Sequence, residues 1–119
     1  MRLLKISIIL LAALLTACAG RPTLYQWGSY EDQLYDMYSD PGKVPAEKQL
    51  GDLEADYQKA RSENKNVPPG YHAHMGYLYY QLGKTDQALQ SFGTERTLYP
   101  ESAEYMKLLI SRLQVKRKR

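Results

Sequence analysis

The sequence contains a single cysteine, Cys18, so no internal disulfide can form. It also lacks an apolar run long enough to cross a membrane, because the run from Ile6 to Ala17 falls short of the roughly 20 residues that a spanning helix needs. Tryptophan and phenylalanine occur once each, whereas tyrosine occurs 11 times. Tyrosine joins an apolar ring to a hydroxyl group, which is typical of half-buried positions and binding surfaces.

The amino terminus has the pattern of a cleaved secretory signal. Arg2 and Lys5 precede the apolar run, which is too short for a permanent span. Its end, Leu15-Thr16-Ala17-Cys18, resembles the lipobox of bacterial lipoproteins, in which small residues precede a cysteine that accepts a diacylglycerol. This resemblance predicts that residues 1–17 are removed as a signal peptide and that Cys18 carries the lipid.

The lipid predicts where the protein resides. A lipoprotein of this kind carries several acyl chains, and two or more chains anchor a protein stably in a membrane. Ala19 and Gly20 follow Cys18, with no Asp at the position that often retains enteric lipoproteins in the inner membrane. The resemblance therefore implies the outer membrane, with the protein on its periplasmic face.

Neither sign of charge dominates the chain. Removal of the first 17 of 119 residues leaves 102, which is enough for one small domain. It also removes Arg2 and Lys5, so the formal net charge falls from +3 to +1. Residues 116–119 are all basic, so the rest of the mature chain is mildly acidic. This distribution is not typical of a nucleic-acid-binding protein. The basic tail suits either anionic lipid head groups or plain solubility.

The spacing of apolar residues predicts an all-α fold after the signal peptide. Residues 18–28 are expected to form a short tether, residues 29–115 an all-helical domain and residues 116–119 a basic tail. The helices are expected over residues 29–40, 45–61, 71–82, 86–98 and 103–115. Inward-facing residues include Leu50, Leu53 and Ala60 in the second of these helices, and Met106, Leu109, Ile110 and Leu113 in the last.

Local signals mark the helix ends. Ser29 is placed to cap the first helix of the domain, with Asp32 three residues later as in a capping box. The sequence Asp40-Pro41-Gly42 ends that helix, and Pro45 opens the next one at its first turn.

Residues 69–102 resemble one tetratricopeptide repeat, a pair of antiparallel helices. The matching residues are Gly76, Tyr79, Gly83, Ala88, Phe92 and Pro100. The resemblance implies that Gly76 and Ala88 lie where the two helices cross closely, that Gly83 permits the turn, and that Pro100 ends the second helix. Two departures, Glu95 and Arg96, put charge where a following repeat would pack.

The opening Leu24-Tyr25-x-Trp27-Gly28-x-Tyr30 is similar to that of a family of small proteobacterial lipoproteins known only as a domain of unknown function. Members of that family are commonly encoded beside a CsgG-like lipoprotein. The resemblance implies an envelope assembly in which another lipoprotein, such as a CsgG-like one, is the partner. It supplies no catalytic residue.

Two other patterns favour structure over chemistry. Gly83-Lys84-Thr85 is like the end of a phosphate-binding loop, but it follows no strand and Leu78 stands where an earlier glycine is needed, so no nucleotide is expected. His72 and His74 are two residues apart, which on a helix separates them by about 200°. They cannot share a metal ion from a regular helix, and no metal or cofactor is predicted.

These observations predict a non-enzymatic adaptor that binds another envelope protein. The alternative is an accessory protein that binds peptidoglycan or another glycan through its tyrosines. A small hydrolase has no support, because no nucleophile and base can be paired once the only thiol is acylated.

The candidate partner-binding residues are Tyr77, Tyr80 and Gln81. They lie on the side of their helix opposite to the predicted crossing, and in tetratricopeptide repeats that side lines a concave groove. The alternative interpretation is that a neighbouring helix buries them as core residues. If this face is idle, the aromatic cluster of Tyr25, Trp27 and Tyr30 becomes the candidate.

Overall fold

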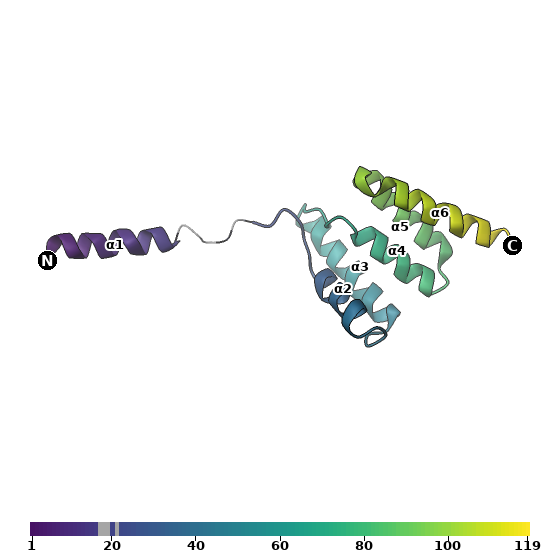
Figure 1. Cartoon of the computed structure of the whole chain (residues 1–119), viewed down its shortest axis with the longest axis horizontal. Helices are drawn as coiled ribbons and strands as arrows, with labels where there is room; N and C mark the ends of the chain where they lie inside the picture. The colour runs from purple at the N-terminus through teal and green to yellow at the C-terminus, as the bar shows by residue number, and fades with distance from the viewer. Residues whose placement is uncertain (17–19, 21) are drawn as a thin grey trace.

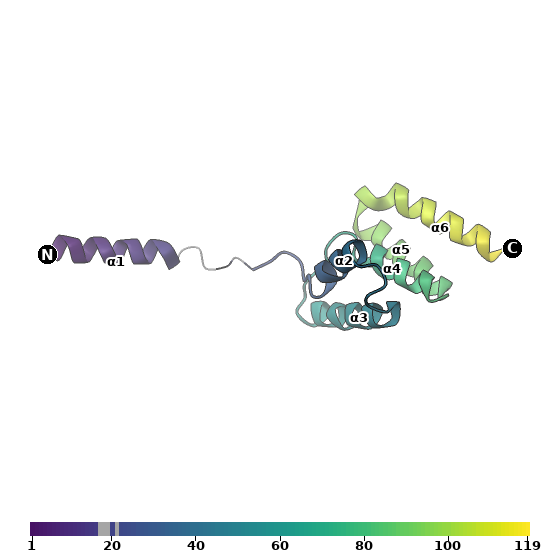
Figure 2. The same ribbon diagram turned by 60° about the horizontal axis from the view of Figure 1, so that its bottom comes forward.

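The computed structural model describes residues 1–16, 20 and 22–119. Within these residues the regular structure is helical, with no strand beyond one isolated backbone bridge between Tyr25 and Asn66, and the all-α fold class is confirmed. The helices are α1 (Arg2–Thr16), α2 (Tyr30–Ser39), α3 (Ala46–Ser62), α4 (Tyr71–Gln81), α5 (Thr85–Leu98), the short 3-10 helix η1 (Pro100–Ser102) and α6 (Ala103–Arg117). Figures 1 and 2 show α4 between the α2 and α3 pair on one side and α6 on the other.

Helix α1 carries the apolar amino-terminal run and stands apart from the other helices in Figure 1. Its apolar side chains, such as Ile6, Ile8 and Leu10, are exposed. In the part of the chain that the structure describes, no helix combines the length and the hydropathy that a membrane span requires. Cys18, the expected site of lipidation, lies outside the described residues.

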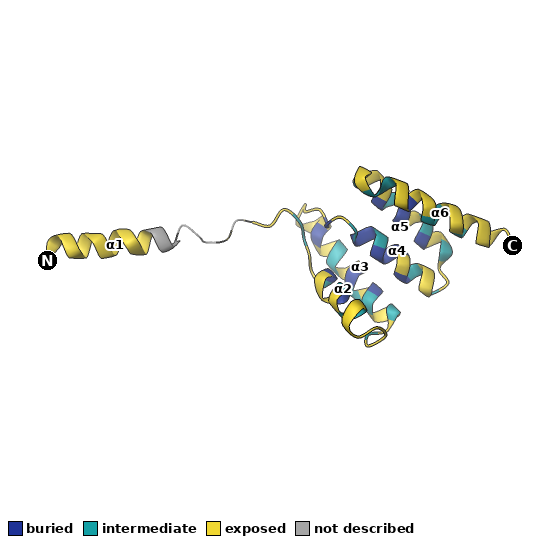
Figure 3. Ribbon diagram, viewed as in Figure 1, coloured by how far each residue is buried: buried dark blue, intermediate teal, exposed yellow. Residues whose placement is uncertain are grey.

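The buried face of α3 is the predicted one. Leu50, Leu53 and Ala60 are buried there, and they form one core cluster with residues of α2 and α4 that include Tyr30 and Tyr71. Figure 3 shows the buried residues on the sides of α3, α4 and α5 that face other helices. Pro45 precedes α3 as its N-cap residue instead of occupying the first helical position.

The capping box expected at Ser29 and Asp32 is not formed. Ser29 is the N-cap residue of α2, but its side chain makes no capping bond. Its Oγ and its backbone amide instead both donate to Oδ2 of Asp56 in α3, each at 2.7 Å. Gly28 is required beside this contact, because its φ is +53° and a Cβ there would lie 2.4 Å from Cγ of Asp56. The start of α2 is therefore fixed by α3 and not by a local cap.

Helices α4 and α5 form a tight hairpin. A Cβ on Gly76 would lie only 2.6 Å from Cε1 of Phe92, so the glycine permits the close crossing that the repeat resemblance implies. Gly83 has a φ of +71° in the turn between the helices, which is where the nucleotide-loop-like sequence lies. Helix α6 packs on this hairpin through Met106, Leu109, Ile110 and Leu113, as predicted.

The charge of Glu95 is not directed at the next helix, contrary to the expectation. The residue is fully buried, and its Oε1 accepts a 2.6 Å hydrogen bond from the backbone amide of Gly70. Its Oε2 accepts a longer one, of 3.4 Å, from the amide of Ala73. The carboxylate thus satisfies free amides at the start of α4, where the helix dipole also favours a negative charge.

Candidate functional site

An apolar groove runs between α2, α4 and α6. Its volume is about 670 Å³ and its lining is mostly apolar. We call it the aromatic groove; its walls include Leu34, Met37 and Tyr38 of α2, Tyr77 and Tyr80 of α4, and Tyr105, Leu109 and Arg112 of α6. The repeat resemblance implies that Tyr77 and Tyr80 lie on the side of α4 away from its crossing with α5, but Phe92, which contacts Gly76 at that crossing, also lines the groove. The groove therefore adjoins the crossing, and the resemblance does not identify the walls that α2 and α6 provide.

Tyr77 and Tyr80 are surface residues, with exposed fractions of 43% and 37%. The alternative that they belong to the core is therefore wrong. Gln81 is also exposed, and its Nε2 donates a 2.8 Å hydrogen bond to the hydroxyl of Tyr77. Gln81 does not itself line the aromatic groove, but this bond connects it to a tyrosine that does.

Basic residues of α6 lie at and beside the groove, with Arg112 in its lining and Lys116 and Arg117 next to it. Nζ of Lys116 donates a 2.8 Å hydrogen bond to the hydroxyl of Tyr80 and lies 5.1 Å from the centre of its ring. Arg117 pairs with Asp86 at 2.8 Å, so the first two residues of the basic tail are helical and contact α4 and α5. The side chain of Arg112 lines the groove and makes no hydrogen bond or ion pair with the described residues, which leaves its charge for a ligand.

The aromatic cluster of Tyr25, Trp27 and Tyr30 packs against the folded domain. Tyr30 is only 6% exposed and packs against Tyr71, with ring centres 5.3 Å apart. Trp27 stacks on Tyr30 and Tyr25 meets the edge of Trp27, with centres 6.3 and 6.4 Å apart. The amide of Gln26 donates a 2.8 Å hydrogen bond to the carbonyl of Asn66. The cluster thus holds the entering chain against the loop before α4, and only Trp27 presents substantial surface.

A family model described as a domain of unknown function, DUF4810, matches residues 24–109. The chain belongs to the DUF4810 family. The match begins at Leu24, where the aromatic opening starts, and extends into α6, so it includes most of the groove. No curated protein and no solved structure matches the chain.

The two histidines of this DUF4810 domain lie on different sides of α4. His72 packs against Tyr57, with ring centres 5.1 Å apart, whereas His74 packs against Tyr30 at 5.9 Å. Each is 5% exposed, and burial lowers the pKa of both, so both rings are neutral at pH 7. Among the described residues no group of three or more His, Cys, Asp or Glu side chains is arranged to hold a metal ion.

Proposed function

We propose that this DUF4810 chain is a lipid-anchored, non-enzymatic adaptor whose aromatic groove binds a segment of another envelope protein. The observation that carries the proposal is the pair of exposed tyrosines, Tyr77 and Tyr80, in an apolar groove of about 670 Å³. Ligand sites are concave and mostly apolar with a few placed polar groups, and tyrosine and arginine are frequent among residues that dominate binding energy.

The lining favours a particular occupant. Apolar side chains of a partner segment would displace water from the walls formed by Leu34, Met37 and Leu109. Arg112 would pair with a carboxylate of the same segment, because its charge is not used within the described residues. The partner is therefore expected to present a short segment with apolar anchors and at least one acidic group.

The anchor comes from the sequence. Lipid on Cys18 would hold the chain on the periplasmic face of the outer membrane, where another envelope lipoprotein is within reach. The resemblance to the lipoprotein family makes a CsgG-like lipoprotein the first partner to test.

Co-purification tests the proposal. The tagged full-length chain is isolated from detergent extracts of envelopes, probed for the CsgG-like lipoprotein, and the binding is then repeated with purified partner. The double variant Tyr77→Ala, Tyr80→Ala should weaken binding about 30-fold or more, which corresponds to about 2 kcal/mol. Arg112→Glu should weaken it as well, by placing a like charge beside the partner's carboxylate.

Tyr35→Ala is the matched control. Tyr35 is an exposed tyrosine of α2 that does not line the groove, so its removal should leave binding unchanged. Unfolding curves of all variants show whether the fold is intact. A double variant that binds the purified partner as tightly as the wild type would overturn the proposal.

A further inference from the structure

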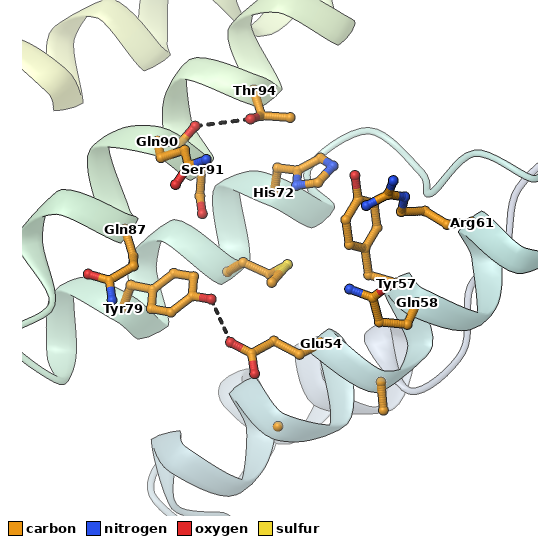
Figure 4. A pocket seen from close by; sticks show the side chains of 13 residues that line it. Glu54, Tyr57, Gln58, Arg61, His72, Tyr79, Gln87, Gln90, Ser91 and Thr94 are labelled. Atoms are coloured by element: carbon orange, nitrogen blue, oxygen red, sulfur yellow. Dashed lines mark hydrogen bonds between the residues drawn. The ribbon is translucent and has the colours of Figure 1, made fainter.

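A second cavity lies between α3 and α5, with α4 behind it (Figure 4). Its volume is about 690 Å³, and its lining differs from that of the aromatic groove because most of its side chains carry polar groups. We call it the polar cleft. Helix α4 contributes His72, Met75 and Tyr79 to the polar cleft and His74, Tyr77 and Tyr80 to the aromatic groove, so the two cavities use different faces of one helix.

Neutral amide groups face one another across the polar cleft. Figure 4 shows Gln58 on the α3 side and Gln87 and Gln90 on the α5 side. All three residues are exposed, and their side chains make no hydrogen bond with the described residues. Each amide both donates and accepts, so the walls offer unpaired groups of both kinds.

The charged residues of the cleft are few and partly engaged. Glu54 accepts a 2.5 Å hydrogen bond from the hydroxyl of Tyr79. Burial is the main reason that the pKa of Tyr79 is raised to about 12, and this bond is the second. Arg61 and Glu54 both line the cleft from α3, and the positive charge of one balances the negative charge of the other. The cleft therefore has no excess of charge that would select a strongly anionic or cationic ligand.

A buried polar atom also borders the cleft. Nε2 of His72 is buried without a hydrogen-bond partner, although the residue lines the cavity. Beside it lies the ring of Tyr57, whose hydroxyl makes no hydrogen bond with the described residues. Nε2 of His72 is enclosed by its neighbours, so the unpaired hydroxyl of Tyr57 is the group at this end of the cleft that can both donate to and accept from a ligand.

We propose that the polar cleft binds a neutral saccharide chain. Sugar hydroxyls donate and accept, as the amides of Gln58, Gln87 and Gln90 do, and the apolar face of a sugar ring can pack on the ring of Tyr57. A peptide is a poorer match, because Met75 is the only large aliphatic side chain in the lining and no pocket for an apolar anchor is formed. The proposal does not rest on the adaptor function, since that function uses the other face of α4.

Titration calorimetry with the detergent-solubilised full-length chain tests the proposal. The probes are chitotetraose, whose sugars carry acetamide groups, and maltotetraose, whose sugars carry hydroxyls alone. Wild type should bind chitotetraose. The double variant Gln87→Ala, Gln90→Ala should raise the dissociation constant about tenfold or more, because the loss of one hydrogen bond raises it by about five- to tenfold. Both glutamines are exposed, so the variant should fold normally. If it melts earlier than wild type, Gln58→Ala replaces it.

The matched control is Tyr77→Ala, Tyr80→Ala, which removes surface from the aromatic groove and should leave saccharide binding unchanged. Binding of chitotetraose alone assigns amino sugars as the ligand class, and binding of both probes assigns neutral saccharides in general. The proposal is wrong if neither probe binds at millimolar concentration, if the glutamine variants bind as wild type does, or if only the groove variant loses binding. Because partner capture is measured separately, failure here leaves the adaptor proposal standing, and the reverse also holds.

Discussion

The hydroxyl of Tyr71 donates a 2.6 Å hydrogen bond to the backbone carbonyl of Leu53, and both residues are fully buried. The bond connects α4 to α3 at the base of the core that the two helix pairs share. Burial raises the pKa of Tyr71, so its hydroxyl remains a donor at neutral pH. The bond adds a polar link to the apolar contacts that already pack α4 on α3.

Tyr71→Phe should destabilise the domain by about 1 kcal/mol, because the ring stays in place while the hydrogen bond is lost. Urea unfolding followed by circular dichroism measures the change in the free energy of unfolding. Tyr35→Phe is the control, since Tyr35 is exposed and its hydroxyl makes no hydrogen bond with the described residues. Equal effects of the two substitutions would show that the buried bond contributes nothing.

Gly76→Ala should destabilise the domain by about 1 to 3 kcal/mol, because the new methyl group would overlap the Phe92 ring. Gly51 is also a helical glycine, but a Cβ there would meet nothing within 4 Å. Gly51→Ala should therefore stabilise the domain by up to about 1 kcal/mol, the difference in helix propensity between the two residues. Thermal unfolding of both variants tests the prediction, which fails if the two melting temperatures move in the same direction.

The helices were predictable because their apolar residues recur at helical spacing. Leu50, Leu53 and Ala60 mark the buried face of α3, and Gly76 and Phe92 mark the crossing of α4 and α5. These features depend on residues that are close in sequence or on one repeat pattern, so they need no knowledge of the tertiary arrangement.

The polar contacts could not be predicted in the same way. Asp56 binds Ser29 across 27 positions, and Glu95 binds Gly70 across 25, so no local pattern identifies either pair. In the sequence, Gln58 and Gln87 have the pattern of solvent-exposed helix positions. They line one cleft only because α3 and α5 lie on either side of it in the folded chain. For the aromatic groove, a sequence signal existed in Tyr105, Leu109 and Arg112, which follow one another at helical intervals of four and three.

Stability should fall as the pH drops below about 6.5, the ordinary pKa of histidine. Burial lowers the pKa of His72 and His74 in the folded chain, so the unfolded chain takes up protons first and gains stability relative to the folded one. The contribution of the neutral rings is complete above pH 6.5 and is lost as the pH falls toward the folded pKa values. Each histidine can contribute at most about 1.4 kcal/mol per pH unit.

Melting temperatures at pH 7 and pH 5 measure this effect. The double variant His72→Gln, His74→Gln removes both titrating rings and should lose less stability between the two pH values than wild type does. An equal loss in both proteins would assign the acid sensitivity to carboxylates instead.

Cys18→Ser should abolish lipidation and release the protein from the membrane fraction, because acyl chains would supply nearly all of its membrane affinity. Incorporation of radiolabelled palmitate and fractionation of cells measure the two effects. Ser7→Ala, a small change within the apolar run, should leave both unchanged. A wild-type protein that takes up no label would exclude the lipid anchor.

The hydrogen bond from the amide of Gln26 to the carbonyl of Asn66 attaches the chain to the folded body at Gln26. The residues between Cys18 and Gln26 therefore set the largest distance between the lipid anchor and the domain. If Cys18 is anchored, the eight residue steps from Cys18 to Gln26 can extend by at most about 28 Å, whatever conformation they take. The point at which the chain joins the folded body is therefore confined to a shell of that depth beneath the lipid head groups. The aromatic groove lies on the folded body beyond that point, so the distance from the membrane at which a partner can bind is limited to this depth plus the dimensions of the domain.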